Sequence, residues 1–128
     1  MKICQLCAVD FTMARLLLPL CTAMQDAGHE VVAICSDGPL LERVEAAGIR
    51  CRPVPIARSM NPFKAMASAR AVADVMREEN FDLVHVHTPV ASLIGRLAAW
   101  RSGVPVIAYT AHGFYFHEHM AWLRRNAF

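Results

Sequence analysis

Three short polar segments of the sequence, each directly after an apolar run, carry the side chains best suited to bind a ligand. They are Asp10-Phe11-Thr12, His87-Thr88 and Thr110-Ala111-His112-Gly113. The runs before them have the composition of strands, and in an open parallel sheet ligands bind at the carboxyl ends of the strands. We therefore expect the three segments to converge on one site that combines a carboxylate, hydroxyls and imidazoles.

His112 is the strongest candidate for a catalytic side chain. Gly113 beside it permits a close approach of the backbone, and an imidazole can donate to a substrate hydroxyl or phosphate. The alternative is a loop histidine that bonds a nearby carbonyl, and position alone does not separate the two. His85 and His87 share one face of their strand, because strand side chains alternate. We expect His85, in mid-strand, to be a satisfied core residue and His87, at the strand end, to belong to the site.

The pattern also favours an anionic or phosphorylated ligand. Helices are expected to begin after Asp10 and at Thr88-Pro89, and the free N–H groups at a helix start attract phosphate. Neither GxGxxG nor GxxxxGK(S/T) occurs, so the two standard glycine-rich phosphate cradles are absent.

Other chemistries fit the spacing poorly. The histidines and the glutamate between His112 and His119 match no zinc motif such as HExxH, so we predict no metal site. Cys4 and Cys7 form a CxxC pair inside an apolar run, with their side chains on opposite faces, which favours core cysteines over a redox pair. The chain has no GxSxG elbow and no carboxylate pair with the separation used in glycoside hydrolysis.

Composition limits the remaining classes. The chain has 128 residues, 55% of them hydrophobic, which is enough for one domain with one core. Thirteen basic against eleven acidic residues give a net charge of +2, without the basic stripe of a nucleic-acid binder. Five cysteines, an odd number, lie in apolar runs, which favours a reducing cytoplasm. Gln5, Asp10 and Arg15 interrupt the first apolar stretch, so we expect neither a signal peptide nor a transmembrane helix.

Alternating strands and helices must position the candidate site. Glycines 28, 48 and 103 each end a helical pattern just before an apolar run begins. The predicted interior strands are 3–9, 31–35, 83–86 and 106–109, and a fifth, 49–54, alternates apolar residues with arginine and contains a proline typical of an edge strand. Right-handed crossovers then give an α/β fold with a Rossmann-like, doubly wound parallel sheet of strand order 3-2-1-4-5.

The helices between these strands have clear starts in two places. Asn61 before Pro62 and Thr88 before Pro89 each pair a capping residue with a proline at the first helical position. Helical spacing of apolar residues covers 17–24, 39–47, 62–80 and 90–97.

The end of the chain raises a separate expectation. The strand 106–109 is apolar on both faces although it lies at a sheet edge, so the tail or further strands should cover it. We expect residues 1–113 to form the Rossmann-like domain, and 114–128 to begin a further helical segment of a longer protein. The aromatic residues and arginines of 114–125 fit a membrane-surface patch or burial against a missing part equally well.

At these residues the sequence resembles the N-terminal domain of family 4 glycosyltransferases of the GT-B fold, in particular bacterial enzymes of capsule and exopolysaccharide assembly. The matching stretches include MKICQLCAVDFT, AGHEVVAICSDGP, IARSMNPFK, FDLVHVHTP and YTAHGFYFHEH. The resemblance implies two Rossmann-like domains facing a cleft, with the acceptor held mainly by the N-terminal domain and the nucleotide-sugar by the C-terminal domain. It also implies transfer with retention of configuration and no obligatory metal or other cofactor.

Carried over by position, the resemblance assigns roles to individual residues. His112 would lie beside the transferred sugar, Gly113 would permit that approach, and the loop from Asp10 to Thr12 would face the donor diphosphate. Arg15 and His87 would be further substrate-binding residues. Many family members have glycines in the loop after the first strand, and none stands there in this chain.

Three functions follow as hypotheses. The first is the acceptor-side domain of a retaining glycosyltransferase that acts on a lipid-linked saccharide, in the cytoplasm or at the inner face of the membrane. Because the donor-binding domain is absent, we expect the 128 residues alone to lack transferase activity. The second is a non-catalytic subunit that binds acceptor or membrane and docks to a separate donor-binding chain. The third is a small-ligand module of flavodoxin-like topology, supported by the fold alone.

Overall fold

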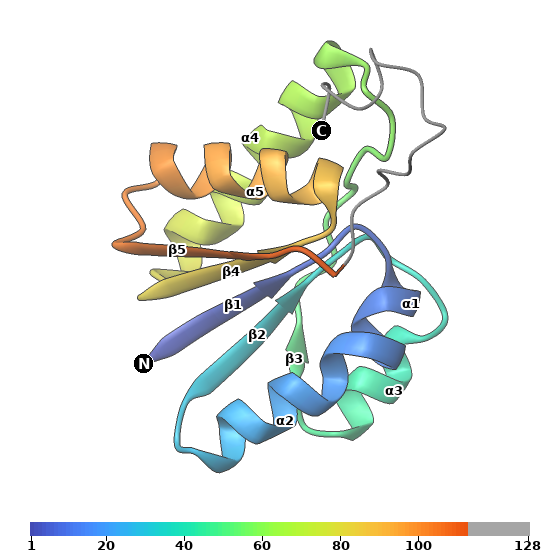
Figure 1. Cartoon of the computed structure of the whole chain (residues 1–128), viewed down its shortest axis with the longest axis vertical. Coiled ribbons are helices and arrows are strands. Elements are labelled where there is room, and N and C mark those ends of the chain that lie inside the picture. Colours follow the sequence, from blue (N-terminus) through green and yellow to red (C-terminus); the bar gives the residue numbers. More distant parts are fainter. Residues whose placement is uncertain (113–128) are drawn as a thin grey trace, which may run out of the picture.

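A parallel sheet of five strands forms the centre of the molecule (Figure 1). The computed structural model describes residues 1–112, and the proposed further helical segment 114–128 lies outside them. The spatial order is β3-β2-β1-β4-β5, as predicted. The strands are β1 (Lys2–Leu6), β2 (Glu30–Ile34), β3 (Arg50–Cys51), β4 (Leu83–His87) and β5 (Val106–Thr110).

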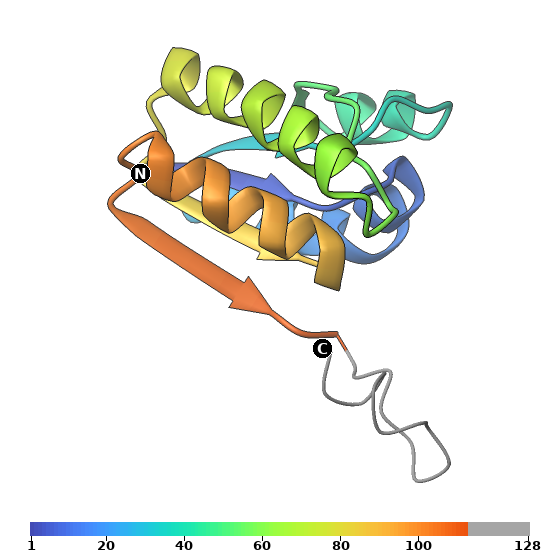
Figure 2. The same ribbon diagram turned by 90° about the horizontal axis from the view of Figure 1, so that it is seen from above.

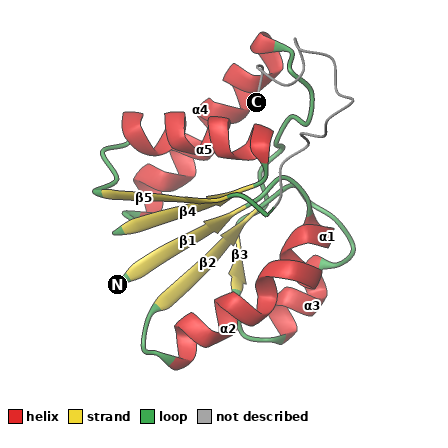
Figure 3. Ribbon diagram, viewed as in Figure 1, coloured by secondary structure: helices red, strands yellow, loops and turns green. Residues whose placement is uncertain are grey.

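Helices cover both faces of this sheet (Figure 3). On one face lie α4 (Pro62–Glu79) and α5 (Pro89–Arg101). On the other lie α1 (Asp10–Thr12), the π-helix η1 (Met13–Leu17), α2 (Leu18–Asp26) and α3 (Leu41–Ala46). The fold is therefore doubly wound. Among the described residues, no helix is long and apolar enough to cross a bilayer.

Each layer has its own apolar core. Cys4, Leu6 and Val86 pack toward α4 and α5, and Val31 and Ala33 pack toward η1, α2 and α3. Because β1 and β2 are buried on both faces, their sequences are nearly continuous apolar runs. Burial of one such side chain stabilises the fold by about 1.5–3 kcal/mol.

Two strands are shorter than predicted. β1 ends at Leu6 rather than residue 9, because the chain leaves the sheet to begin α1 at Asp10. β3 contains only two residues, because Pro53 lacks the N–H that a regular ladder needs. The backbone N–H of Val54 still donates to Cys35 O at 2.9 Å, so β3 continues irregularly along β2.

The two predicted helix caps have different outcomes. Asn61 caps α4 as expected, since its Oδ1 accepts from the N–H groups of Phe63 (3.0 Å) and Lys64 (3.3 Å). Thr88 stands at the corresponding place before α5, but its side chain makes no cap hydrogen bond. The prediction was right about the position of Thr88 and wrong about its bonding.

The cysteines are structural residues. Cys4, Cys7, Cys21 and Cys35 are buried, Cys51 is partly buried, and all five are free. Burial raises the pKa of Cys21 to about 12 and that of Cys51 to about 11, so both remain uncharged thiols. The core interpretation of the Cys4 and Cys7 pair is confirmed.

β5 lies at an edge of the sheet, as predicted, and no strand within residues 1–112 pairs with its outer side. The cover that we expect from the tail or from further strands lies outside the described residues. Figure 2 shows β5 at the margin of the molecule, beside β4. Val106, Ile107 and Tyr109 are 46%, 38% and 43% exposed within the described residues. The guanidinium of Arg96 on α5 lies over the Tyr109 ring, 5.5 Å from its centroid.

Candidate functional site

The candidate site lies where the winding of the sheet reverses. β1 and β4 are neighbours, yet the helices that follow them cover opposite faces of the sheet (Figure 1). Because β1, β4 and β5 run parallel, the loops that follow them leave the sheet at the same end, that of the strand carboxyl termini, as predicted. Such a reversal is the usual ligand position in an open α/β sheet.

A row of three histidines lies at this edge. The strand register pairs His87 with Thr110, so His112, two residues further along, comes beside His87. Nδ1 of His87 is 2.8 Å from Nε2 of His112, and the two rings are stacked with centroids 5.0 Å apart. His85 lies on the same strand face as His87, and the centroids of their rings are 4.1 Å apart. The structure thus joins two of the predicted site residues, His87 and His112.

Gln5 is a member of this cluster that the sequence reasoning missed. Its Oε1 lies 2.7 Å from Nε2 of His87, and both side chains are fully buried. On its other side, Nε2 of Gln5 donates to Sδ of Met24 at 3.1 Å. The available signal was a lone amide inside an otherwise apolar strand, since a buried polar group needs a partner.

Burial keeps the two histidines of β4 neutral. It lowers the pKa of His87 to about 3, with smaller contributions from the neighbouring rings of His85 and His112. Burial likewise lowers the pKa of His85, whose Nε2 lies 2.7 Å from the Thr110 hydroxyl. His85 is therefore a satisfied histidine, as expected, although it is only half-buried. A neutral imidazole has one donor and one acceptor nitrogen.

The loop after β1 is held against the loop after β2 by Asp10. Its Oδ1 accepts from the Phe11 N–H at 2.8 Å and its Oδ2 from the Leu40 N–H at 2.9 Å. A Cβ at Gly38 would collide with this carboxyl group, so any other residue there would have to displace it. The start of α1 thus already holds a carboxylate, and the Phe11 N–H that we expected to be free for a phosphate is occupied.

The other residues predicted after β1 face outward. Phe11 is 60% exposed, Thr12 is partly buried and Arg15 is exposed on η1. Arg15 forms no ion pair within residues 1–112. Gly113, the remaining predicted site residue, lies outside the described residues.

Thr88 adds a strained residue at the same edge. Its φ of 67° is unusual for a β-branched residue and costs on the order of 1–3 kcal/mol. Its Oγ1 is buried and has no hydrogen-bond partner in the described part of the chain. Strain of this kind is concentrated at functional sites, and the position agrees with the predicted His87-Thr88 segment.

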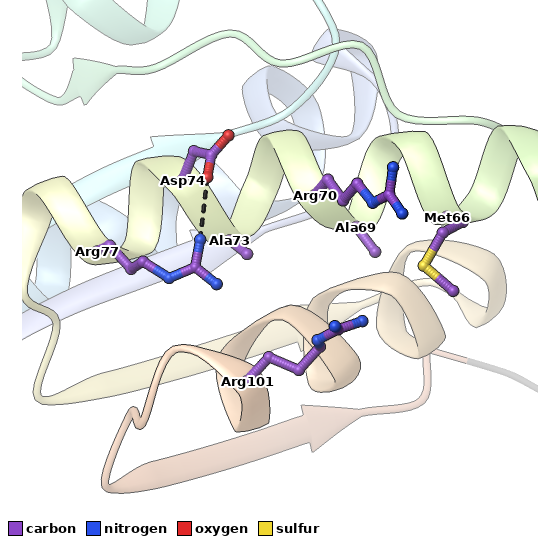
Figure 4. A pocket seen from close by; sticks show the side chains of 7 residues that line it. All are labelled: Met66, Ala69, Arg70, Ala73, Asp74, Arg77 and Arg101. Carbon is purple, nitrogen blue, oxygen red and sulfur yellow. Dashed lines mark hydrogen bonds and ion pairs between the residues drawn. The ribbon is translucent and has the colours of Figure 1, made fainter.

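Two hollows flank α4. An open pocket of about 650 Å³ lies between the loop after β2 and the first half of α4, with Asp37 and Lys64 as its charged lining residues. A smaller groove of about 180 Å³ separates α4 from the end of α5 and is lined by Arg70, Arg77 and Arg101 (Figure 4). Asp74 forms an ion pair with Arg77, with 3.0 Å between Oδ1 and Nη1. The larger pocket adjoins the loop that Asp10 holds and has the volume of a small-molecule site.

Known proteins give this arrangement a context. Residues 12–128 match the family described as "Glycosyl transferase 4-like domain". A UDP-Gal:alpha-D-GlcNAc-diphosphoundecaprenol alpha-1,3-galactosyltransferase of Escherichia coli is 33% identical over 91 residues, which are 70% of this chain and 23% of that protein. EpsD of Bacillus subtilis, named as a glycosyltransferase, is 33% identical over 118 residues, 90% of this chain and 30% of that protein.

A solved structure shows the same fold. A glycosyltransferase from Rickettsia africae superposes with a TM-score of 0.75 at 21% identity, over 92% of this chain and 31% of that one. The chain spans about a quarter to a third of the length of these relatives.

Proposed function

Because the chain belongs to the glycosyl transferase 4-like domain family, we propose that it forms the acceptor-side domain of a retaining glycosyltransferase. The reaction would move a hexosyl group from a nucleotide-sugar to a saccharide during cell-surface polysaccharide synthesis. The observation that carries the proposal is the family match over residues 12–128, which includes His85, His87 and His112.

A lipid-linked acceptor is the finer part of the proposal. The Escherichia coli relative is named for a galactosyl transfer to GlcNAc-diphosphoundecaprenol, a saccharide on a lipid diphosphate. An acceptor of this kind has a sugar, an anionic linker and a lipid, so the enzyme has to work at a membrane surface. We place the protein in the cytoplasm, peripheral at the inner face of the membrane.

The start of α4 offers side chains for such a contact. Met60 and Phe63 are 63% and 86% exposed, and Arg58 and Lys64 beside them are exposed as well. Exposed apolar groups flanked by cations suit the interface of a membrane with anionic headgroups. Lys64 also lines the 650 Å³ pocket, so a saccharide bound there would lie close to the lipid.

The site geometry and the family support the following residue roles. We assign His112 to the transferred sugar, with Gly113 permitting its approach. Asp10 orders the loop through its two backbone hydrogen bonds. We assign the loop from Asp10 to Thr12 and the exposed Arg15 on η1 to the donor diphosphate. The role of His87 is to hold His112 by the 2.8 Å contact. The donor-binding groups that complete the site would come from a second domain or from a partner chain.

A transfer assay tests the proposal. An enzyme containing this chain is incubated with UDP-sugars and a lipid-diphosphate saccharide, and the product is measured for wild type, His112→Ala and His29→Ala. His29 lies just before β2, at the opposite end of the sheet, and serves as the matched control. We expect transfer by wild type and by His29→Ala, and a loss of at least about 100-fold in His112→Ala. Equal transfer by all three would contradict the role of His112.

The 128-residue chain provides the second arm of this experiment. Transition-state stabilisation requires donor and acceptor groups held together, so the chain alone should transfer no sugar. Transfer by the isolated chain would contradict the two-part site. Activity restored by a separate donor-binding polypeptide would favour the alternative of a split enzyme.

A further inference from the structure

We propose that Gln5 is a positioning residue, whose buried amide fixes, through His87, which ring nitrogen of His112 carries the proton. The inference deepens the proposed function and rests on it only for the effect on catalysis. The three side chains form a continuous row, with 2.7 Å from Oε1 of Gln5 to Nε2 of His87 and 2.8 Å from Nδ1 of His87 to Nε2 of His112.

The orientation of the Gln5 amide follows from its second neighbour. The amide lies between the imidazole of His87 and the thioether of Met24. A thioether accepts a hydrogen bond weakly and cannot donate one, so the NH₂ group faces Met24 and the carbonyl oxygen faces His87. Gln5 is fully buried, which removes bulk water as an alternative partner for either end of the amide.

This orientation determines the proton positions of the two histidines in turn. The Gln5 carbonyl can only accept, so Nε2 of His87 must carry a hydrogen and donate it. His87 is neutral because burial lowers its pKa, so its Nδ1 has the lone pair and must accept. The neighbouring Nε2 of His112 must therefore donate, and a neutral His112 is left with its lone pair on Nδ1.

The result changes what His112 can offer to a ligand. His112 is exposed, and no residue among 1–112 forms a hydrogen bond with its Nδ1. In its neutral form this nitrogen accepts a hydrogen bond, and the matching ligand group is a hydroxyl that donates, as on a sugar. An ionised phosphate oxygen, as in a diphosphate diester, cannot donate, so the neutral ring selects against it. The expectation that His112 donates to its ligand is thus restricted to the protonated ring.

Nitrogen-15 NMR of labelled protein reads the tautomer directly. We expect wild-type His112 to show a protonated Nε2 and an unprotonated Nδ1 under conditions where the ring is neutral, which the shifts themselves report. In Gln5→Met a weakly accepting thioether replaces the amide oxygen that accepts from His87, at similar volume, so the opposite tautomer of His112 should rise from a trace to a comparable share. Gln25→Met, which removes an amide that binds Gly48 O on the surface, is the matched control and should leave the tautomer unchanged.

A second variant tests the same inference without replacing the buried amide of Gln5. Met24→Leu is a volume-conserving substitution that cores tolerate, and it removes the thioether that orients the amide. The amide can then present either end to His87, and the second tautomer of His112 should again appear. A wild-type His112 protonated on Nδ1 would overturn the proposal. So would unchanged tautomers in folded Met24→Leu or Gln5→Met.

Catalysis separates this inference from the proposed function. In a preparation with transferase activity, Gln5→Met should lower kcat by about 10- to 100-fold, by analogy with the partners that orient metal-binding histidines, with little change in KM for the nucleotide-sugar. If the tautomer responds to Gln5 but His112→Ala keeps full activity, the proposed function of His112 fails and the tautomer control stands. If His112→Ala is inactive and Gln5→Met leaves the tautomer unchanged, the proposed function of His112 stands and the tautomer control by Gln5 fails.

Discussion

Burial keeps His87, at the centre of the candidate site, uncharged, and the stability of the fold therefore depends on pH. The pKa of His87 is about 3 in the folded chain and about 6.5 when unfolded. Below pH 6.5 the unfolded chain binds the additional proton, so the free energy of unfolding falls as the pH falls from 6.5 toward 3. We predict a loss approaching about 1.4 kcal/mol per pH unit from His87.

Urea unfolding at pH 7.5, 6.5 and 5.5 measures this loss. His87→Asn has no titrating group at this position and should reduce the pH dependence, leaving the part that comes from His85. His29→Asn, at the other end of the sheet, should keep the full dependence. A wild-type chain equally stable at pH 7.5 and 5.5 would contradict the buried neutral state of His87.

A second prediction at the residue scale concerns the contact between the loops after β1 and β2. A methyl group at Gly38 would displace the Asp10 carboxyl from the Leu40 N–H. Gly38→Ala should therefore lower the free energy of unfolding by about 1–3 kcal/mol. The loss should be smaller in an Asp10→Ala background, because the obstructing carboxyl is gone. Additive losses in the double variant, measured by urea unfolding, would contradict a direct contact.

At this scale, sequence reasoning found the residues at strand ends and missed their partners. His87 and His112 were predictable because each follows an apolar run. Gln5 was not, because its partner His87 is 82 residues away and depends on the pairing of β1 with β4. The use of Asp10 to tie two loops was equally hidden, since Leu40 reaches it only through the fold.

At the scale of elements, a charge cluster joins the end of α4 to the first and third strands. The Glu79 carboxylate is within 2.6–2.8 Å of Arg50, Arg52 and Lys2, and hydrogen bonds, first of all from Arg50, hold its pKa well below its usual range. Glu79→Gln leaves three cations without their shared partner and should cost about 1–3 kcal/mol. Glu78→Gln breaks one exposed pair with Arg52 and should cost less than about 1 kcal/mol. Equal losses in urea unfolding would contradict this difference.

The elements themselves differ in how far the sequence predicts them. The bounds of α4 follow from Asn61 and Pro62 at one end and a polar Asn80 at the other. The π-helix η1 was not predicted, although Pro19 indicates it. Proline has no N–H to donate to the Arg15 carbonyl four residues earlier, and the proline ring clashes with that carbonyl. Thr88 resembles a cap in sequence, but its backbone takes a positive φ that no local pattern shows.

At the scale of the whole molecule, the outer side of β5 pairs with no strand of residues 1–112, and this edge predicts self-association of the 128-residue chain wherever the tail does not cover it. Unpaired strand edges with apolar side chains template pairing with another chain. We expect oligomers whose share rises with concentration in analytical ultracentrifugation, and fewer of them in Ile107→Lys. Leu16→Lys alters a residue that is 51% exposed on η1, away from this edge, and should leave the oligomers unchanged. A wild-type chain that stays monomeric at all concentrations would contradict the prediction.

The most direct test of the account is which ligand the isolated chain binds. The labelled 128-residue chain is titrated separately with a short-chain lipid-diphosphate saccharide and with a nucleotide-sugar, and the chemical shifts are followed by NMR. The account predicts that the saccharide shifts the signals of Lys64 and of the pocket that it lines. The nucleotide-sugar should bind only weakly and perturb His112 and the loop from Asp10 to Thr12 slightly, because the donor is held mainly by the other domain. Tight binding of the nucleotide-sugar or of a flavin, with no response to the saccharide, would contradict an acceptor-side domain.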